Sequence, residues 1–509
     1  MNTESAAADP LHIGLVAQPE ILARAQQASG QKALPHPTVD ERRAVGRAAR
    51  TKTPRHSLGA WQSPQDRADP VALLMSQETT RVAHLIPVRH ARMATSAFAF
   101  YRGAALVMAA DLATRPRSGL HVQLCGDAHL SNFGVFAAPD RSLVFDVNDF
   151  DETHPGPFEW DVQRLATSFI LAARENGMSN KAGAAAAEVV CSSYRQSIAK
   201  FAERRELDVW YHRIDVNALL GASKDASDAT RKAKKLTKEQ QQVAHAESKA
   251  RLRDAWSAVS KITEVVDGKR QFRHDPPLLL RIDVTDDLRA VINSLFHEYR
   301  ATLQEDRQAL LKRYEVVDFG HKVVGVGSVG LLAFVLLLRG RDEDDLMVLQ
   351  VKQAQASVLE AFTQKSAFTK QGHRVVTGQR LMQAASDSFL GWIDGPAGRN
   401  YYVRQLRDMK WAPDPSSLTG KRLSRYASRC GMTLARAHAR SGDAIALSAY
   451  LGSGTAFDKA TSAFALSYAD QAEQDFDAFV AAIADDRLSS HEDAGGAESM
   501  RAAQAVVES

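Results

Sequence analysis

Residues 121–165 contain side chains whose types and spacing suit phosphoryl transfer. The stretch includes CGDAHLSNFGVF and SLVFDVNDFDETHPGPFEWDVQRL, and Asp127 and Asn132 stand five positions apart in a loop directly after an expected strand. Phosphoryl transfer needs a carboxylate that orients the attacking hydroxyl and oxygen ligands for Mg²⁺, which a D-x-x-x-x-N loop supplies. Asp149 follows the next expected strand, where a second carboxylate could join the metal to nucleotide phosphates. A hairpin of these two strands would bring both loops to one edge of a sheet.

A purely structural interpretation competes with this one, because Asp and Asn commonly cap turns. The D-x-x-x-x-N spacing also arises by chance, but its combination with a strand, Asp-Phe and then P-x-x-W-D is far more specific and favours a site for metal and phosphate. Three choices stay open. Asp146 rivals Asp149 as a metal ligand beside Asn132, and His129 either contacts phosphate or shapes the loop. Arg102 either faces this loop, where a guanidinium suits phosphate oxygens, or is a buried structural arginine.

A second stretch, residues 314–360, could hold a nucleotide. Gly325, Gly327 and Gly330 form G-x-G-x-x-G between two expected strands, where glycine lets backbone amides approach phosphate closely. A strand rather than a helix follows, so the pattern predicts a hairpin of the kinase type rather than a Rossmann turn. The alternative is an ordinary hairpin.

Lys352 stands at the end of the next expected strand, in VLQVKQA, and is similar to the lysine of the V-A-I-K motif. Glu360 is the only acidic residue in 346–386, so it is the natural ion-pair partner, although a separation of eight is short for that role. A surface lysine is the alternative interpretation.

These motifs resemble the aminoglycoside phosphotransferase and choline kinase branch of the protein-kinase-like superfamily, in which a G-D-x-H-x-x-N loop precedes a strand, an Asp-Phe or Asp-Trp pair and D-L-A. GDAHLSNFG, NDFDE and GPFEWDVQRLATS are still more similar to the bacterial family catalogued as domain of unknown function 2252, over about residues 70–485. The resemblance implies that Asp127 is the catalytic base, that Asn132 and Asp149 hold Mg²⁺, and that Asp161 braces the catalytic loop. Cys125 departs from the branch, which usually has His there.

The order of the motifs differs from that of an ordinary kinase, because the glycine-rich stretch and the lysine follow the catalytic loop. The helix RCGMTLARAHARSGD, near the end of the chain, resembles the helix that precedes the catalytic loop in phosphotransferases. We therefore expect an α+β, two-lobed protein-kinase-like fold that is circularly permuted and carries added helices. The expected units are a poorly ordered arm (1–60), a helical lobe with the catalytic and metal loops (61–205), a charged helical insertion or linker (206–310), a β-rich nucleotide lobe (311–410), helices completing the helical lobe (411–485) and a flexible tail (486–509).

The bulk composition restricts the classes of partner. The chain has 64 basic and 60 acidic residues and a net charge of +4, which is too weak a bias to indicate nucleic acid. No run of about 18 apolar residues occurs, so no membrane span is expected. The three cysteines lie far apart without a C-x-x-C pair, which indicates free thiols in a reducing compartment but leaves one disulfide open. The cytoplasm is the expected location.

The function expected from these observations is transfer of a phosphoryl group from ATP, with Mg²⁺, to a hydroxyl of an unknown small-molecule or protein substrate. One alternative is nucleotidyl transfer on the same fold, with the nucleotide bound in reverse. Another is a metal-dependent hydrolase that uses the Asp and His cluster, which consists of Asp127, His129, Asp146, Asp149 and Asp151. A third is a nucleotide-binding regulator without turnover.

Overall fold

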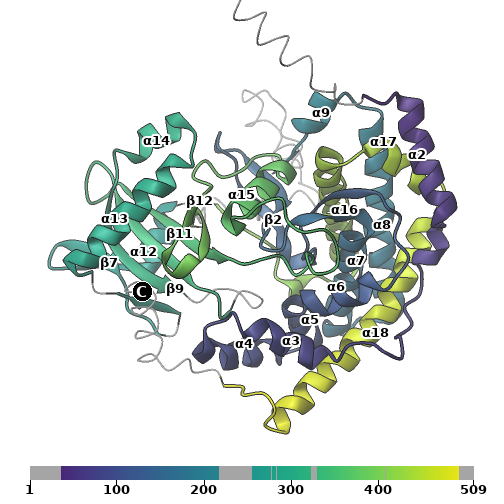
Figure 1. Cartoon of the computed structure of the whole chain (residues 1–509), viewed down its shortest axis with the longest axis horizontal. Coiled ribbons are helices and arrows are strands. Elements are labelled where there is room, and N and C mark those ends of the chain that lie inside the picture. Colours follow the sequence, from purple (N-terminus) through teal and green to yellow (C-terminus); the bar gives the residue numbers. More distant parts are fainter. Residues whose placement is uncertain are drawn as a thin grey trace, which may run out of the picture.

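A helical region and a β-rich region make up the part of the chain that the computed structural model describes, which is residues 36–216, 255–276, 278–282, 284–322, 329–406 and 409–491. Figure 1 shows the two regions side by side, with α15 (Gln371–Met382) between them. The fold is therefore mixed α+β, as expected. Residues 217–254, within the charged insertion or linker expected over 206–310, lie outside the described residues.

The helical region is built around α7, which is buried along almost its entire length, from Phe158 to Ala173. α8, α16 and α18 pack around it. Its buried polar side chains, such as Asp161 and Arg164, are hydrogen-bonded within the protein, as burial requires. The helices of this region are α2 (Val39–Lys52), α3 (Pro70–Glu78), α4 (Ile86–Met93), α5 (Ala97–Gly103), α6 (Ala105–Ala113), α7 (Phe158–Glu175), α8 (Asn180–Ala202), α9 (Glu206–Trp210), α16 (Gly420–Ser441), α17 (Ala444–Leu451) and α18 (Ala456–Ala484).

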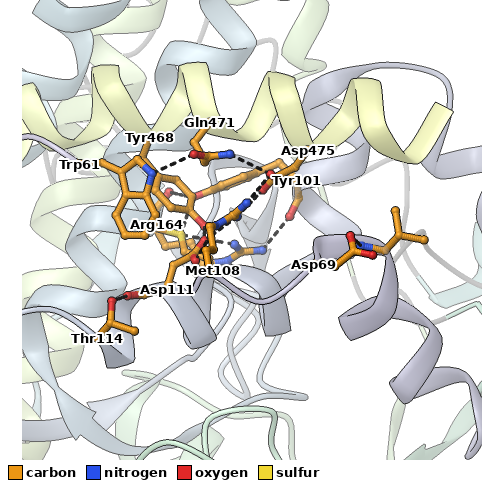
Figure 2. Close-up of polar contacts among 12 residues, drawn as sticks. Trp61, Asp69, Tyr101, Met108, Asp111, Thr114, Arg164, Tyr468, Gln471 and Asp475 are labelled. Atoms are coloured by element: carbon orange, nitrogen blue, oxygen red, sulfur yellow. Dashed lines mark hydrogen bonds and ion pairs between the residues drawn. The ribbon is translucent and has the colours of Figure 1, made fainter. Parts of the chain in front are cut away.

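The segment from Trp61 to Arg67 is tied to α18 by a buried polar network. The Arg67 guanidinium donates to the carboxylates of both Asp111 and Asp475, and the Trp61 indole N–H donates to Gln471. Figure 2 shows Gln471 and Asp475 of α18 beside Trp61. One guanidinium thus satisfies two buried carboxylates, which fixes the start of the helical region against its last helix.

Residues 36–60 are not a loose arm, so this expectation is wrong for the described part of it. Thr38 and Glu41 form a capping box, in which the Thr38 backbone N–H donates to Glu41 and the Glu41 N–H donates to the Thr38 hydroxyl. The helix that they start, α2, packs closely on α17, because Gly46 lies against the backbone of Ala446. The T-x-x-E pattern of a capping box, from Thr38 to Glu41, can be read in the sequence. The expected flexible tail also starts too early, because Leu488 is buried.

A two-stranded sheet, and a hairpin whose chain lies between the two strands of that sheet, carry the loops of interest. β1 (His121–Leu124) pairs with β4 (His154–Pro157), and β2 (Phe133–Ala137) pairs with β3 (Leu143–Val147), all antiparallel. The expected hairpin of the strands at 122–124 and 142–147 is therefore wrong, because the unforeseen strand β2 pairs with β3 instead. Antiparallel pairing of β2 and β3 still brings the start of one beside the end of the other. The β2–β3 sheet also includes β5 (Ile214–Asp215).

The β-rich region contains a six-stranded antiparallel sheet with the strand order β12-β13-β11-β10-β9-β8. Its strands are β8 (Leu279–Arg281), β9 (Glu315–Lys322), β10 (Ala333–Arg339), β11 (Leu346–Ala354), β12 (Gly391–Asp394) and β13 (Asn400–Gln405). Successive apolar residues of β10 alternate between two cores, as the period of a strand requires: Leu336 packs with α13 (Asp286–Ala301), and Val335 packs with Val259 of α12 (Ala255–Ile262). A further helix is α14 (Glu305–Leu311), and β6 (Thr263–Val266) pairs with β7 (Lys269–Phe272). Because β8 and α13 pack with the sheet, this region begins before the expected boundary at residue 311.

The three cysteines, Cys125, Cys191 and Cys430, are all free and buried. In the described part of the chain, every helix is too short or too polar to cross a membrane.

His321 in β9 generates a prediction about pH. The imidazole is buried against Phe334, neither ring nitrogen has a hydrogen-bond partner in the described part of the chain, and burial lowers the pKa to about 4. Between pH 6.5 and 4 the unfolded chain therefore binds a proton that the folded chain excludes, so stability falls as the pH falls. We expect His321→Leu to raise the free energy of unfolding by about 1–2 kcal/mol at pH 7 and to weaken the loss of stability on acidification. Denaturant unfolding at pH 7, 6 and 5 measures both effects.

His56→Leu, at an exposed position, is the control for the loss of a histidine. If the stability of the His321 variant and that of the wild type fell in parallel with pH, the prediction would be contradicted.

Candidate functional site

A cavity of about 800 Å³ lies between the helical and β-rich regions. Its wall includes side chains from the stretch between α3 and α4, from α5, from the loops after β1 and β3, from the end of β11 and from the start of β13. The polar lining residues used below are Arg81, Arg102, Asp127, His129, Asn132, Asp149, Asp151 and Arg399. The two stretches that the sequence singles out thus meet at one cavity.

The carboxylate of Asp127 is held on one side only. Arg164 donates from Nε to Asp127 Oδ1 over 2.6 Å and from Nη2 to the carbonyl oxygen of Tyr101 over 2.9 Å. Figure 2 shows Arg164 beside Tyr101 and Met108. The side-chain amide of Asn132 donates to the backbone carbonyl of Asp127 over 2.8 Å, which closes the loop. Asp127 is 22% exposed and lines the cavity. Its Oδ2 accepts no hydrogen bond in the described part of the chain, with Nε2 of His129 3.6 Å away, so this oxygen is available to a ligand.

His129 is a neutral side chain at physiological pH. Burial lowers its pKa to about 3, against the opposing effect of the Asp127 charge. The ring lines the cavity, and its Nδ1 has no partner in the described part of the chain. A neutral imidazole can shape the loop or accept a hydrogen bond from a ligand, but it cannot supply positive charge to a phosphate.

Asp161 at the start of α7 fixes the backbone of the same loop. It accepts the backbone N–H groups of Cys125, over 2.8 Å, and of Gly126, over 3.1 Å, and Nε2 of His438 lies 3.2 Å away. Gly126 has φ +82°, and a Cβ there would come within 2.2 Å of the carbonyl oxygen of Glu152, so the turn requires glycine. The expected bracing position of Asp161 is confirmed.

Asp149 lines the cavity, and its Oδ1 is buried without a hydrogen-bond partner in the described part of the chain. Burial alone would favour the neutral acid, but the charges of Lys352, Arg404 and Lys410 lower the pKa of Asp149, so the carboxylate is ionised. The backbone N–H of Asn148 donates to the carbonyl of Asn132 over 2.8 Å, which holds the end of β3 against the start of β2.

Asp146 is placed differently, and its expected role as a metal ligand is corrected. It is 1% exposed, pairs with Arg436 of α16 and accepts the backbone N–H of Ala384 over 3.0 Å. Both carboxylate oxygens are therefore occupied by protein donors. Asp149 is the carboxylate of this pair that faces the cavity.

Lys352 is 3% exposed and forms an ion pair with Asp151, 201 positions earlier in the chain. The other oxygen of Asp151 accepts a hydrogen bond from the Tyr402 hydroxyl over 2.7 Å. Burial alone would lower the pKa of Lys352, but the charges of Asp149 and Asp151 outweigh it and raise the pKa, so the ammonium stays charged.

Glu360 is not the partner of Lys352, and that expectation is wrong. It lies in the turn after β11, and one of its carboxylate oxygens is buried without a hydrogen-bond partner in the described part of the chain. The first acid that follows Lys352 in the sequence is thus not its partner in space. Asp151 was singled out in the sequence only as part of an acidic cluster.

The glycine-rich connection is described in part. Gly330 has φ +89° and lies against Arg81, while Gly325 and Gly327 lie outside the described residues. β9 and β10 on either side pair antiparallel, so a hairpin connection is confirmed. The Arg81 guanidinium donates to the carbonyl of Val329 over 2.6 Å, which ties the hairpin to the helical region.

Sequence reasoning gave little weight to Arg374 in α15, yet it organises the cavity wall. Its guanidinium donates to the backbone carbonyls of Thr153, Asp151 and Gln355. It thereby clamps the loop after β3 to the chain after β11. A buried arginine that binds carbonyl groups carries no distinguishing pattern in a single sequence.

The bracing contacts of Asp161 lead to a prediction. Removing this carboxylate leaves two buried amides without an acceptor, and each such loss costs about 1–3 kcal/mol. We expect Asp161→Ala to lower the thermal midpoint clearly, with Asp161→Asn intermediate because it keeps one acceptor oxygen. Asp470→Ala is the matched control, since Asp470 also pairs with an arginine but is 57% exposed, and exposed pairs contribute about 0–1 kcal/mol. Equal midpoints for Asp161→Ala and the control would contradict the bracing role.

Comparison with known families covers most of the chain. A family described as an uncharacterized protein conserved in bacteria (DUF2252) matches residues 81–482, which include the strands β1 to β4, the six-stranded sheet and α16. No curated protein and no solved structure matches the chain. The match confirms the family resemblance of the motifs around Asp127 and Asp149. Because it spans well over half of the 509 residues, the chain belongs to this bacterial family.

Proposed function

We propose that the cavity binds ATP with Mg²⁺ and that the protein transfers the γ-phosphoryl group to a hydroxyl of a second substrate. One observation carries the proposal: Asp127, Asp149 and Asp151 line one cavity, and Asp151 pairs with Lys352, which is 201 positions away in the chain and lies buried behind the cavity wall. Phosphoryl transfer needs these groups together, since it depends on positioning and charge stabilisation more than on covalent chemistry.

Asp127 is the base of the proposed reaction. Its free oxygen accepts the proton of the attacking hydroxyl as the bond from the hydroxyl oxygen to the γ-phosphorus forms. The bond between the γ-phosphorus and the β–γ bridging oxygen breaks, and ADP leaves with the electron pair. Arg164 holds the carboxylate and Asn132 holds the backbone carbonyl of Asp127 during this step.

Asp149 and Asn132 fit the binding of a magnesium ion. Asp149 presents an ionised carboxylate with an unpartnered oxygen, and Asn132 lines the same cavity. In the described part of the chain, His, Cys, Asp and Glu side chains do not form a group of three that could hold a metal. This donor set suits Mg²⁺, which is usually bound by one or two protein oxygens together with substrate phosphates. When bound, the ion would neutralise charge that develops on the phosphates.

A circularly permuted kinase-like fold is part of the proposal, and two features support it. In kinases a glycine-rich hairpin is followed by the strand that bears the lysine and then by a helix. The order β9, β10, β11 with Lys352, and α15 follows that pattern. At the other end, Ser441 closes α16, and its hydroxyl accepts the backbone N–H of Gln123 in β1 over 3.1 Å. The helix expected to precede the catalytic loop thus ends beside the strand that leads into it.

The position of Asp146 weighs against the hydrolase alternative. A hydrolase of the expected type would use the whole Asp and His cluster, whereas Asp146 is taken up by Arg436. Nucleotidyl transfer would use the same cavity and the same ion. ATP labelled at the α- or the γ-phosphate tells the two transfers apart, because the label on the product reports which phosphorus was attacked.

Thermal stabilisation by ATP with Mg²⁺ tests the proposal. A ligand at 100 times its Kd stabilises the folded state by about 2.7 kcal/mol, which raises the melting temperature by several degrees. We expect this shift to need both ATP and Mg²⁺, to fall by more than half in Lys352→Ala, and to lose its dependence on Mg²⁺ in Asp149→Asn.

The matched pair Asp151→Asn and Glu360→Gln separates the two candidate partners of the lysine. Each variant neutralises one carboxylate near β11, but only Asp151 contacts Lys352. We expect Asp151→Asn to weaken ATP binding and Glu360→Gln to leave it unchanged. A wild-type protein whose melting temperature does not respond to ATP with Mg²⁺ would refute the proposed function.

A further inference from the structure

Arg102, in the last turn of α5, lines the cavity with a guanidinium that has no protein partner. In the described part of the chain it makes no hydrogen bond or ion pair, and its Nε is buried and unsatisfied. Its recorded contact is with the ring of Phe98, whose centre lies 5.8 Å from the guanidinium carbon. The aromatic ring supports the side chain from one side and leaves its donors without acceptors.

Three other buried arginines around the cavity donate to acceptors of the protein. Arg164 binds Asp127, and Arg374 binds three backbone carbonyls. Arg81 has a buried Nε without a partner, but its Nη1 donates to the carbonyl of Val329, a contact for which Arg102 has no counterpart in the described part of the chain. Arg399 also has one buried nitrogen without a partner, but it belongs to the β-rich wall beside Asn400. A guanidinium is an obligate donor, and its burial costs free energy unless an acceptor is supplied. The acceptor missing at Arg102 is therefore expected from a ligand.

Arg102 belongs to the part of the cavity where Asp127, His129 and Asp149 gather. Burial lowers its pKa, but the charges of Asp127, Glu175 and Asp149 act in the opposite direction. The charge of Arg102 in turn helps to lower the pKa of His129. The guanidinium thus interacts electrostatically with Asp127 and Asp149 but forms an ion pair with neither. A group bound between the base and the metal-holding carboxylate would lie within its reach.

We propose that Arg102 binds the oxygens of the phosphoryl group in transfer and stabilises the charge that they carry in the transition state. This inference rests on the proposed function. A guanidinium presents planar paired donors that match phosphate oxygens, and an arginine supplied within the same chain can accelerate phosphoryl transfer strongly. Lys352 would hold the phosphates that remain with the nucleotide, so the two cations have separate tasks.

Binding of MgADP with and without aluminium fluoride tests this assignment without knowledge of the acceptor. Aluminium fluoride beside ADP mimics the phosphoryl group in transfer. For the wild type we expect aluminium fluoride to tighten ADP binding, as measured by isothermal titration calorimetry. For Arg102→Ala we expect ADP alone to bind within about threefold of the wild type, but the gain from aluminium fluoride to fall by about 100-fold or more. Arg102→Lys should keep part of the gain, since it retains the charge but not the fork.

Arg115→Ala is the matched control, because Arg115 is also half-buried and lies over an aromatic ring, Phe464, at 5.0 Å, but donates to backbone carbonyls and does not line the cavity. In Arg115→Ala, aluminium fluoride should tighten ADP binding as much as in the wild type, even if the melting temperature of the variant is lower. Two results would overturn the inference and leave the proposed function standing. In the first, aluminium fluoride tightens ADP binding in Arg102→Ala as much as in the wild type. In the second, Arg102→Ala weakens the binding of ADP alone and of ADP with aluminium fluoride by the same factor. A wild type that binds MgADP but gains nothing from aluminium fluoride would overturn the inference as well. A wild type that does not bind MgADP would overturn both proposals.

Discussion

The ion pair between Lys352 and Asp151 is the contact on which the cavity depends. A buried ammonium is tolerated only when a partner and further hydrogen bonds offset the loss of water, and Asp151 with Tyr402 provides this arrangement. Asp151 belongs to the loop after β3, whereas Lys352 and Tyr402 stand opposite each other on β11 and β13. The pair therefore fixes the position of the sheet relative to the loops of the helical region. Without it, two unpaired charges would be left at the contact between the regions.

The helical region has the complementary task of holding the loops rigid. α7 provides two side chains for this purpose: Asp161 accepts amides of the loop after β1, and Arg164 holds the carboxylate of Asp127. α16 supplies His438 beside Asp161 and Arg436 to Asp146. All four side chains are almost completely buried, so their positions are set by the core and not by the ligand. Such fixed positions are what a reaction that relies on orientation requires.

The charges around the cavity are interleaved, and this arrangement favours a ligand that carries both signs. Asp127 pairs with Arg164 and Asp151 pairs with Lys352. Nearby cations lower the pKa of Asp149 and keep it negative, and nearby carboxylates raise the pKa of Lys352 and keep it positive. A polyphosphate with a divalent cation would add negative and positive charge together. Such a ligand would satisfy Asp149 through its metal and Arg102 through its phosphate oxygens without leaving either sign in excess.

The sequence by itself determined the local parts of this protein. The D-x-x-x-x-N loop after a strand, the two strands on either side of the glycine-rich stretch and the strand that bears Lys352 are all set by neighbours within a few positions, so their patterns are visible in one chain. Tertiary structure alone decided which distant groups meet. In the folded protein, Lys352 pairs with Asp151 and not with Glu360. Asp146 pairs with Arg436, and Arg102 lines the cavity. These pairings depend on how two regions pack across about 200 residues of chain, and no spacing in the sequence encodes that distance.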